Sequence, residues 1–325
     1  MKFTVKEESS LLEFLYTCYP QQSRTGVKNY LKNDMVVVNG QDCKAHDWPL
    51  RKGDTVEVIN KGQSRGKQLK VKATEKVKDL GLTIVYEDAH LIVVDKPSGL
   101  PTIATKTKGD TGRNTGIFGG RERTAYSILM DYCHSQVKAF HLSTGEYAPR
   151  GTGRVWIVHR LDRDTSGLLL FAKDERTKDI LQSKWSEMVI ERKYFAILEG
   201  RPQESEGVIE SYLVENPKSL KMTSLPRESH DSQRAVTRYR CTDFSGRYTR
   251  AEFELETGRK NQIRVHAAQE LGCPVAGDRK YGAQYNPVGR LALHAGTLIF
   301  RNPYLDGPEI LKFESPVPAN WAKLR

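Results

Sequence analysis

The sequence predicts an α+β fold, with a small N-terminal α/β module ahead of a larger domain built on a mainly antiparallel mixed sheet. Beyond residue 80 the chain carries many short β-type runs bounded by Gly, Pro or Asp, with few helical patterns between them. Strands that follow one another without a regular helical crossover favour antiparallel pairing. A polar, basic stretch at residues 61–80 is typical of a connector. We therefore divide the chain into residues 1–60, a linker at 61–80 and residues 81–325.

The first 60 residues alternate helical and strand patterns. LLEFLYTCY reads as a short amphipathic helix, Ser23 is expected to cap a second helix, and VVVNG and RKGDTVEVI read as strands. Three basic residues recur at helical spacing in the second helix: Arg24, Lys28 and Lys32. This face either contacts an RNA backbone or is an ordinary solvated helix face.

The basic surplus is concentrated in the linker. The chain of 325 residues has 51 Lys and Arg against 40 Asp and Glu, a net charge of +11. Residues 1–60 hold eight basic and eight acidic side chains, residues 61–78 hold seven and one, and residues 79–325 hold 36 and 31. More than half of the surplus therefore lies on eighteen residues.

In the larger domain the strand patterns outnumber the helical ones. The expected strands are TIVYED, LIVVDKP, GLLLFAKD, KYFAILEG, AVTRYRC, AEFELETG and LALHAGTLIF, and the expected helices lie near 124–133 and 177–189. The glycine-rich stretch 108–123 lacks the spacing of a phosphate-binding loop, and no strand leads directly into it. We expect a mobile loop there.

The composition excludes several classes of protein. The five cysteines show no CxxC or metal-type spacing, so neither a disulfide framework nor a zinc site is predicted. The first residues lack the apolar core of a secretory signal, and the apolar runs are too short to span a bilayer. We expect a cytoplasmic protein with reduced thiols and no membrane partner.

The most informative segment is VWIVHRLDRDTSGLLLFAKD at 155–174. It places Asp162 between a β-branched run and a fully apolar strand, at the mouth of buried sheet structure. Turn amides and an arginine there would hold a carboxylate ionised, which makes Asp162 a candidate nucleophile. Equally, Asp162 satisfies turn amides or pairs with Arg160.

This segment resembles the signature block of the RluA family of RNA pseudouridine synthases, in which the aspartate of HRLD is catalytic. EDAHLIVVDKPSGLPT at 87–102 is similar to the family's first block, and ETGRKNQIRVHAAQELGCPVAGDRKYG at 256–282 to its last. The resemblance covers about residues 82–318. It implies an isomerase that converts uridine in RNA to pseudouridine.

The resemblance assigns roles to four residues. It implies that Asp162 is the catalytic residue, that Tyr194 stacks on the target base, that Arg264 pairs with Asp162, and that Arg160 helps to extrude the target nucleotide. The alternative for Tyr194 is a core aromatic on an alternating strand, and the alternative for Arg264 is a surface ion-pair residue.

Two departures from the family pattern leave points open. Residues 258–262 read GRKNQ where the family usually reads GRTHQ, so substrate contacts near that turn are unsettled. The stretch at 103–150 is longer than usual. It is either a specificity element or an insertion without consequence.

The N-terminal segment resembles the small RNA-binding domain named after small-subunit ribosomal protein S-four. That order of domains is similar to enzymes of large-subunit (23S) ribosomal RNA, which implies ribosomal RNA or a pre-ribosomal particle as the partner. A base inside folded RNA cannot be reached in place, so we expect base flipping. Three linker lysines would then tether RNA: Lys67, Lys70 and Lys72. We expect a monomer that needs no cofactor and no metal, because the isomerisation requires neither redox chemistry nor energy input.

Three alternatives stay open. One is a synthase that acts on transfer RNA. Another is a non-catalytic RNA-binding or ribosome-assembly factor that keeps the fold. The last is a glycoside hydrolase that uses Asp162 with a second carboxylate, Asp164 or Glu256.

Overall fold

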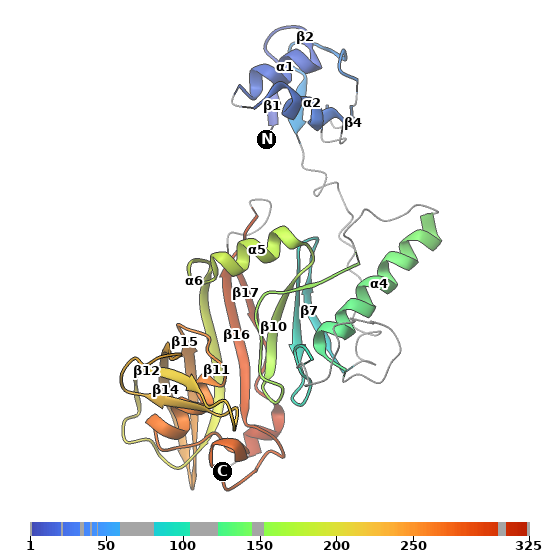
Figure 1. The fold of residues 1–325 in the computed structure, drawn as a ribbon. Helices are drawn as coiled ribbons and strands as arrows, with labels where there is room; N and C mark the ends of the chain where they lie inside the picture. The colour runs from blue at the N-terminus through green and yellow to red at the C-terminus, as the bar shows by residue number, and fades with distance from the viewer. Residues whose placement is uncertain are drawn as a thin grey trace. The chain divides into compact units, whose positions relative to one another are not determined.

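The chain forms two compact units, residues 1–72 and residues 73–325 (Figure 1). The computed structural model describes residues 2–20, 22–32, 36–39, 41–43, 45–58, 81–104, 123–144, 153–304 and 310–323. The α+β fold predicted from the sequence is confirmed. The linker lysines Lys67, Lys70 and Lys72 and most of the glycine-rich stretch lie outside the described residues. In the described part, no helix is both long and apolar enough to cross a membrane.

The N-terminal unit combines two helices with short antiparallel strands. Its elements are β1 (Lys2–Thr4), β2 (Ser9–Ser10), α1 (Leu11–Cys18), α2 (Arg24–Lys32), β3 (Val36–Val38), β4 (Gln41–Asp42), β5 (Pro49–Leu50) and β6 (Thr55–Val58). The sheet order is β1-β6-β3-β4, and β2 pairs with β5. Leu15 of α1, Val27 of α2 and Val56 of β6 meet in one buried core. The predicted cap is present, because the Gly26 N–H donates to Ser23 Oγ at 3.1 Å.

Helix α2 carries the three basic residues expected to form one face. The Arg24 guanidinium lies 5.6 Å from the Tyr16 ring centroid, and Lys28 is exposed. Lys32 ends the helix, and its side chain is outside the described part. Their contact with RNA stays a prediction.

The larger unit is organised around one eleven-stranded sheet. Its strands are β7 (Thr83–Glu87), β8 (Leu91–Lys96), β9 (Trp156–Ile157), β10 (Ser166–Ala172), β11 (Val189–Glu199), β12 (Glu206–Glu215), β13 (Met222–Leu225), β14 (Gln233–Ser245), β15 (Tyr248–Leu255), β16 (Leu293–Arg301) and β17 (Ile310–Glu314). The order is β13-β12-β14-β15-β11-β16-β10-β8-β7, with β17 on β16 and β9 on β10. Of these pairs, only β10 and β16 run parallel.

The helices are few, as the sequence predicts. They are α4 (Ala125–Thr144), α5 (Glu175–Ser183), α6 (Trp185–Met188), α7 (Gln262–Val265), the π-helical turn η2 (His266–Glu270) and the 3-10 turns η3 (Arg279–Tyr281) and η4 (Ala319–Lys323). Helix α4 is longer than the predicted 124–133. Its buried residues end at Cys133, although Val137 and Phe140 continue the helical spacing of apolar residues beyond the predicted end.

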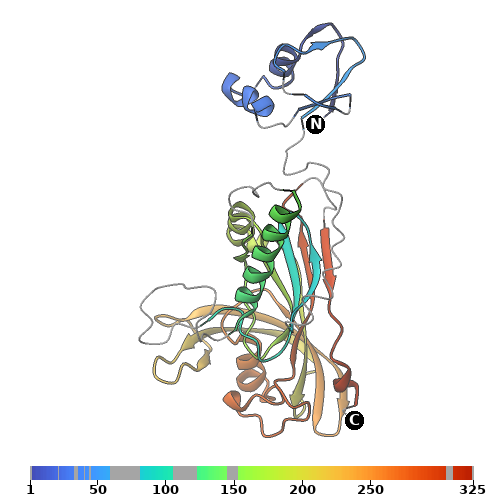
Figure 2. The same ribbon diagram turned by 90° about the vertical axis from the view of Figure 1, so that its right-hand side faces the viewer.

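Helices cover both faces of the sheet around β8 and β10. Because successive side chains of a strand point to opposite faces, Leu169 and Phe171 pack with residues of α4, whereas Leu168 and Leu170 pack with Leu181 of α5. Figure 2 shows α4 lying along one face of the sheet. All seven residues of β10 are buried, which explains its uninterrupted apolar run.

The start of β10 crosses β16 at a glycine. Gly167 has φ +110°, and a Cβ placed there would lie 2.2 Å from the carbonyl oxygen of Ala295. Only glycine fits this close parallel crossing. Asp162 lies five residues earlier in the chain, so the crossing fixes the end of the loop that carries it.

Candidate active site

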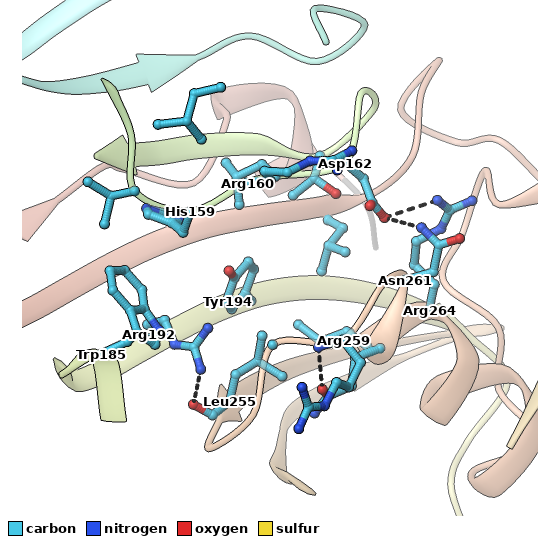
Figure 3. Close-up of a pocket in the computed structure, with 18 of the residues that line it drawn as sticks. His159, Arg160, Asp162, Trp185, Arg192, Tyr194, Leu255, Arg259, Asn261 and Arg264 are labelled. Atoms are coloured by element: carbon cyan, nitrogen blue, oxygen red, sulfur yellow. Dashed lines mark hydrogen bonds and ion pairs between the residues drawn. The ribbon is translucent and has the colours of Figure 1, made fainter. Parts of the chain in front are cut away.

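A cavity of about 510 Å³ opens beside that loop (Figure 3). Its walls come from residues 157–162, from β11, and from the turn and helix at 258–264. These segments lie far apart in the sequence and meet only through the sheet order. Asp162 supplies the one carboxylate among the described residues that line the cavity.

Residues of the first family-like block hold the backbone of the Asp162 loop. Thr102 Oγ1 donates to the Leu161 carbonyl at 2.9 Å and accepts from its N–H at 3.2 Å. The fully buried Lys96 Nζ donates to the carbonyls of Arg163, Leu100 and Pro97 at 2.8 to 3.0 Å. Burial lowers the pKa of Lys96 to about 7, and three acceptors match the three N–H groups of its ammonium.

The Asp162 carboxylate is held through one of its two oxygens. Oδ2 accepts from Asn261 Nδ2 at 2.6 Å and from Arg264 Nη1 at 3.1 Å. No described residue donates to Oδ1. The side chain is 27% exposed, so the carboxylate is fixed in direction yet accessible. The ion pair of Asp162 is with Arg264 and not with Arg160, which was one of the alternatives that the sequence left open.

Arg264 bridges Asp162 to a second, deeply buried carboxylate. Its Nε and Nη2 donate to Asp278 at 2.6 and 2.8 Å, the bidentate geometry that orients a guanidinium most firmly. Burial alone would lower the pKa of Arg264, but the hydrogen bonds and charge of Asp278, reinforced by Asp162, raise it above its ordinary value. The cation beside Asp162 is therefore permanent.

Asn261 is a residue of the site to which sequence reasoning assigned no role. It has φ 54°, in the left-handed region that Asn tolerates better than most residues. Tyr281 Oη donates to Asn261 Oδ1 at 3.1 Å, which leaves Nδ2 to face Asp162. The departure from GRTHQ thus places an amide donor on the carboxylate. The only sign of this role in the sequence was that residues 258–262 read GRKNQ in place of GRTHQ.

Tyr194 projects from β11 into the same cavity. It is 7% exposed, and in Figure 3 it lies between Asp162 and the pair Trp185 and Arg192. Burial raises the pKa of Tyr194. The charge of Arg192 opposes this effect and the charge of Asp162 adds to it, but burial dominates, so the hydroxyl stays protonated. An aromatic ring that lines the cavity near a carboxylate is suited to hold a planar base.

The family is decided by comparison with known proteins. A family model described as RNA pseudouridylate synthase matches residues 90–269, more than half of the chain. This chain belongs to the RNA pseudouridine synthase family. It is an isomerase that acts on RNA, of the RluA type that the sequence predicted.

Relatives match over almost the whole of this pseudouridine synthase. A Bacillus subtilis protein named uncharacterized RNA pseudouridine synthase YlyB is 33% identical over 96% of the chain and 91% of its own length. A Rickettsia typhi protein named ribosomal large subunit pseudouridine synthase C is 29% identical over 94% and 93%. The solved structure of human RNA pseudouridylate synthase domain containing 4 superposes with a TM-score of 0.53, at 25% identity over 74% of this chain and 90% of its own.

The remaining residues of interest in this synthase lie at the rim or the far end of the cavity. Arg160 is exposed and lines the rim. His159 Nε2 accepts from the Leu170 N–H at 3.1 Å, and burial, with the charge of Arg192, lowers the pKa of His159 to about 3. The imidazole is therefore neutral and structural at physiological pH.

The geometry does not support the two-carboxylate alternative. Glu256 pairs with Arg238 at 2.6 Å, and Asp164 is exposed outside this cavity. A glycoside hydrolase of the usual type needs a second carboxylate facing the first. In the described part of the chain, no cluster of His, Cys, Asp or Glu has the arrangement of a metal site.

Proposed function

We propose that this enzyme converts specific uridines of large-subunit (23S) ribosomal RNA to pseudouridine, with Asp162 as the nucleophile. The observation that carries the proposal is the half-held carboxylate, whose Oδ2 is bound by Asn261 and Arg264 while Oδ1 receives no donor from the described residues. A carboxylate fixed in this way is oriented and accessible on one side, as a nucleophile requires. The Rickettsia relative's name supports ribosomal RNA as the substrate.

The reaction begins with a nucleotide that leaves the RNA stack. A base inside folded RNA is out of reach, so the target is extruded, with Arg160 at the rim taking part, and its base stacks on Tyr194. Asp162 Oδ1 then bonds to C1′ of the ribose as the C1′–N1 bond breaks, and the electron pair leaves with uracil.

The base turns within the cavity before it is rejoined. C5 attacks C1′ and displaces Asp162, the proton on C5 passes to water, and N1 takes up a proton. Atoms and electrons balance without an oxidant or reductant. The Arg264 guanidinium stays charged throughout, so it stabilises the negative charge of Asp162 before the attack and again after C5 has displaced Asp162.

The test is tritium release from 23S ribosomal RNA that carries 5-tritiated uridine. Asp162→Asn keeps the shape of the side chain and removes the nucleophile, so we expect release to fall by at least about a thousandfold with RNA affinity close to wild type. Asp164→Asn is the matched control, two residues away and exposed, and should release tritium like wild type.

Parallel reactions with transfer RNA identify the substrate. If tritium is released from transfer RNA and not from ribosomal RNA, the substrate is a transfer RNA. Substantial turnover by Asp162→Asn would overturn the nucleophile. A wild-type protein that binds RNA in a salt-sensitive complex and forms no pseudouridine would instead be an assembly factor.

A further inference from the structure

One buried charge in the cavity, that of Arg192, has no counter-charge among the described residues. Arg192 is 8% exposed, and its Nη2 donates to the carbonyls of Leu255, Glu256 and Thr257 at 3.1, 3.4 and 3.1 Å. Its Nε is buried and has no hydrogen-bond partner among the described residues. No carboxylate of the described residues is within ion-pair distance of it. Backbone dipoles offset a buried cation only in part, so such an arrangement is costly unless a ligand completes it.

The guanidinium is built into the end of the cavity away from Asp162. Arg192 and Tyr194 stand two residues apart on β11, so both point to the same face and line the cavity. The Trp185 ring lies 5.7 Å from the guanidinium. A Cβ on Gly258 would come within 2.9 Å of Arg192 Nη1, so the glycine leaves room for it. Figure 3 shows Tyr194 between Asp162 and Arg192.

The shape of uracil relates this charge to the reaction. When C1′ is at Asp162 and the base lies on Tyr194, the ring atom opposite N1 is C4, so O4 points to the far end of the cavity. After the base turns to bring C5 to C1′, the ring atom opposite C5 is C2, and O2 takes the same place. Both orientations therefore present a carbonyl oxygen to the far end. Breaking the C1′–N1 bond places negative charge on these two oxygens.

We infer that Arg192 binds the far carbonyl oxygen of the target uracil and stabilises the uracil anion while the base is detached. The inference rests on the proposed function and adds a catalytic residue to it. The guanidinium donates hydrogen bonds, first to O4 and then to O2, and no proton is transferred. Cytosine carries an amino group in place of O4, so its N–H donors would face the N–H donors of the guanidinium. The same contact therefore selects uracil over cytosine.

The experiment compares two leaving groups in single-turnover reactions. Arg192→Met removes the charge, and we expect it to slow uridine conversion by about a hundredfold, the usual effect of losing one preorganised donor to a developing anion. In RNA with 5-fluorouridine at the target, the fluorine stabilises the anion by itself. On this RNA the rate is measured as loss of the N1-linked nucleoside, and Arg192→Met should slow it by only about tenfold or less.

Equal penalties on the two RNAs would show that Arg192 only supports the fold, and would overturn the inference. Arg192→Lys keeps a charge without the planar fork, and should show a smaller penalty with the same preference. If the Met variant is unstable, Arg192→Lys takes its place in the comparison of the two RNAs.

Lys193→Met is the matched control on the same strand. Lys193 pairs with Glu191 outside the cavity, so this substitution should alter neither rate. Absence of pseudouridine with wild type would overturn the proposed function, whereas equal penalties overturn only the role of Arg192.

Discussion

At the scale of single residues, Asp278, Arg264 and Asp162 form a chain of alternating charges, and no described residue donates to its last oxygen, Oδ1 of Asp162. Asp278 holds Arg264, and Arg264 and Asn261 hold Oδ2 of Asp162. Two carboxylates share one guanidinium, so the charge of Asp162 is balanced only in part. The neutral amide of Asn261 supplies a donor without adding charge, which makes it the most informative position to alter.

Replacing Asn261 by Asp should shift the pH dependence of the rate. The substitution puts a second carboxylate where the Asn261 amide lies 2.6 Å from Oδ2 of Asp162, and two carboxylates that close to one another do not both ionise readily. We expect the acid limb of the profile of kcat/KM against pH to move upward by about one unit or more. Activity at pH 6 should fall more than activity at pH 8.

Asn261→Gly is the control for this shift, because glycine also accepts the left-handed backbone but carries no charge. It should lower the rate by about tenfold, the effect of one lost hydrogen bond to a charged group, and leave the profile in place. Identical profiles for the wild type and the Asp variant would mean that residue 261 does not contact the nucleophile.

Sequence reasoning identified part of this chain of charges. The family resemblance predicted the contact between Asp162 and Arg264, which are 102 residues apart, and the structure shows it. Asp278 and Arg192 were missed. Asp278 lies 14 residues after Arg264, just before the η3 turn, and Arg192 directly precedes the predicted strand KYFAILEG. Burial of a polar residue by distant segments leaves no local pattern in the sequence.

At the scale of elements, the crossing of β10 and β16 connects the fold to the site. The apolar run of β10 and the strand β16 were both predicted, but their parallel pairing was not. Propensity and alternation identify a strand, whereas the partner of a strand depends on tertiary packing. In the sequence, Gly167 is only the first residue of the predicted strand GLLLFAKD. Its close approach to Ala295 appears once the two strands are paired.

Gly167→Ala should destabilise the larger unit strongly. The new Cβ would clash with the Ala295 carbonyl in a backbone region that alanine avoids, so we expect the free energy of unfolding to fall by about 3 kcal/mol or more. Urea denaturation measures this change. Gly246→Ala has φ 59° but no atom within 4 Å of its Cβ, so it should cost only about 1 kcal/mol. Similar small losses for both variants would contradict the packing argument.

At the scale of the whole molecule, more than half of the net charge of +11 lies on residues 61–78, and a basic segment of this kind suits an enzyme that binds RNA. We predict that changing Lys67, Lys70 and Lys72 to Gln weakens RNA binding and reduces the slope of log affinity against log salt by up to about 2. Fewer counterions are released when three phosphate contacts are lost. Binding titrations at several salt concentrations measure the slope.

The matched control changes three lysines of the larger unit, Lys138, Lys178 and Lys312, to Gln, for the same loss of net charge. Its salt slope should stay near that of wild type. If the linker variant also keeps the wild-type slope, the linker lysines do not contact RNA and the surplus serves only solubility.

The most direct test of the account is a transcriptome-wide map of pseudouridine in a strain that lacks this protein. We predict that specific pseudouridines disappear from large-subunit ribosomal RNA, and that they return with the wild-type chain but not with Asp162→Asn. A map that is unchanged by the deletion, or that is restored by Asp162→Asn, would contradict it.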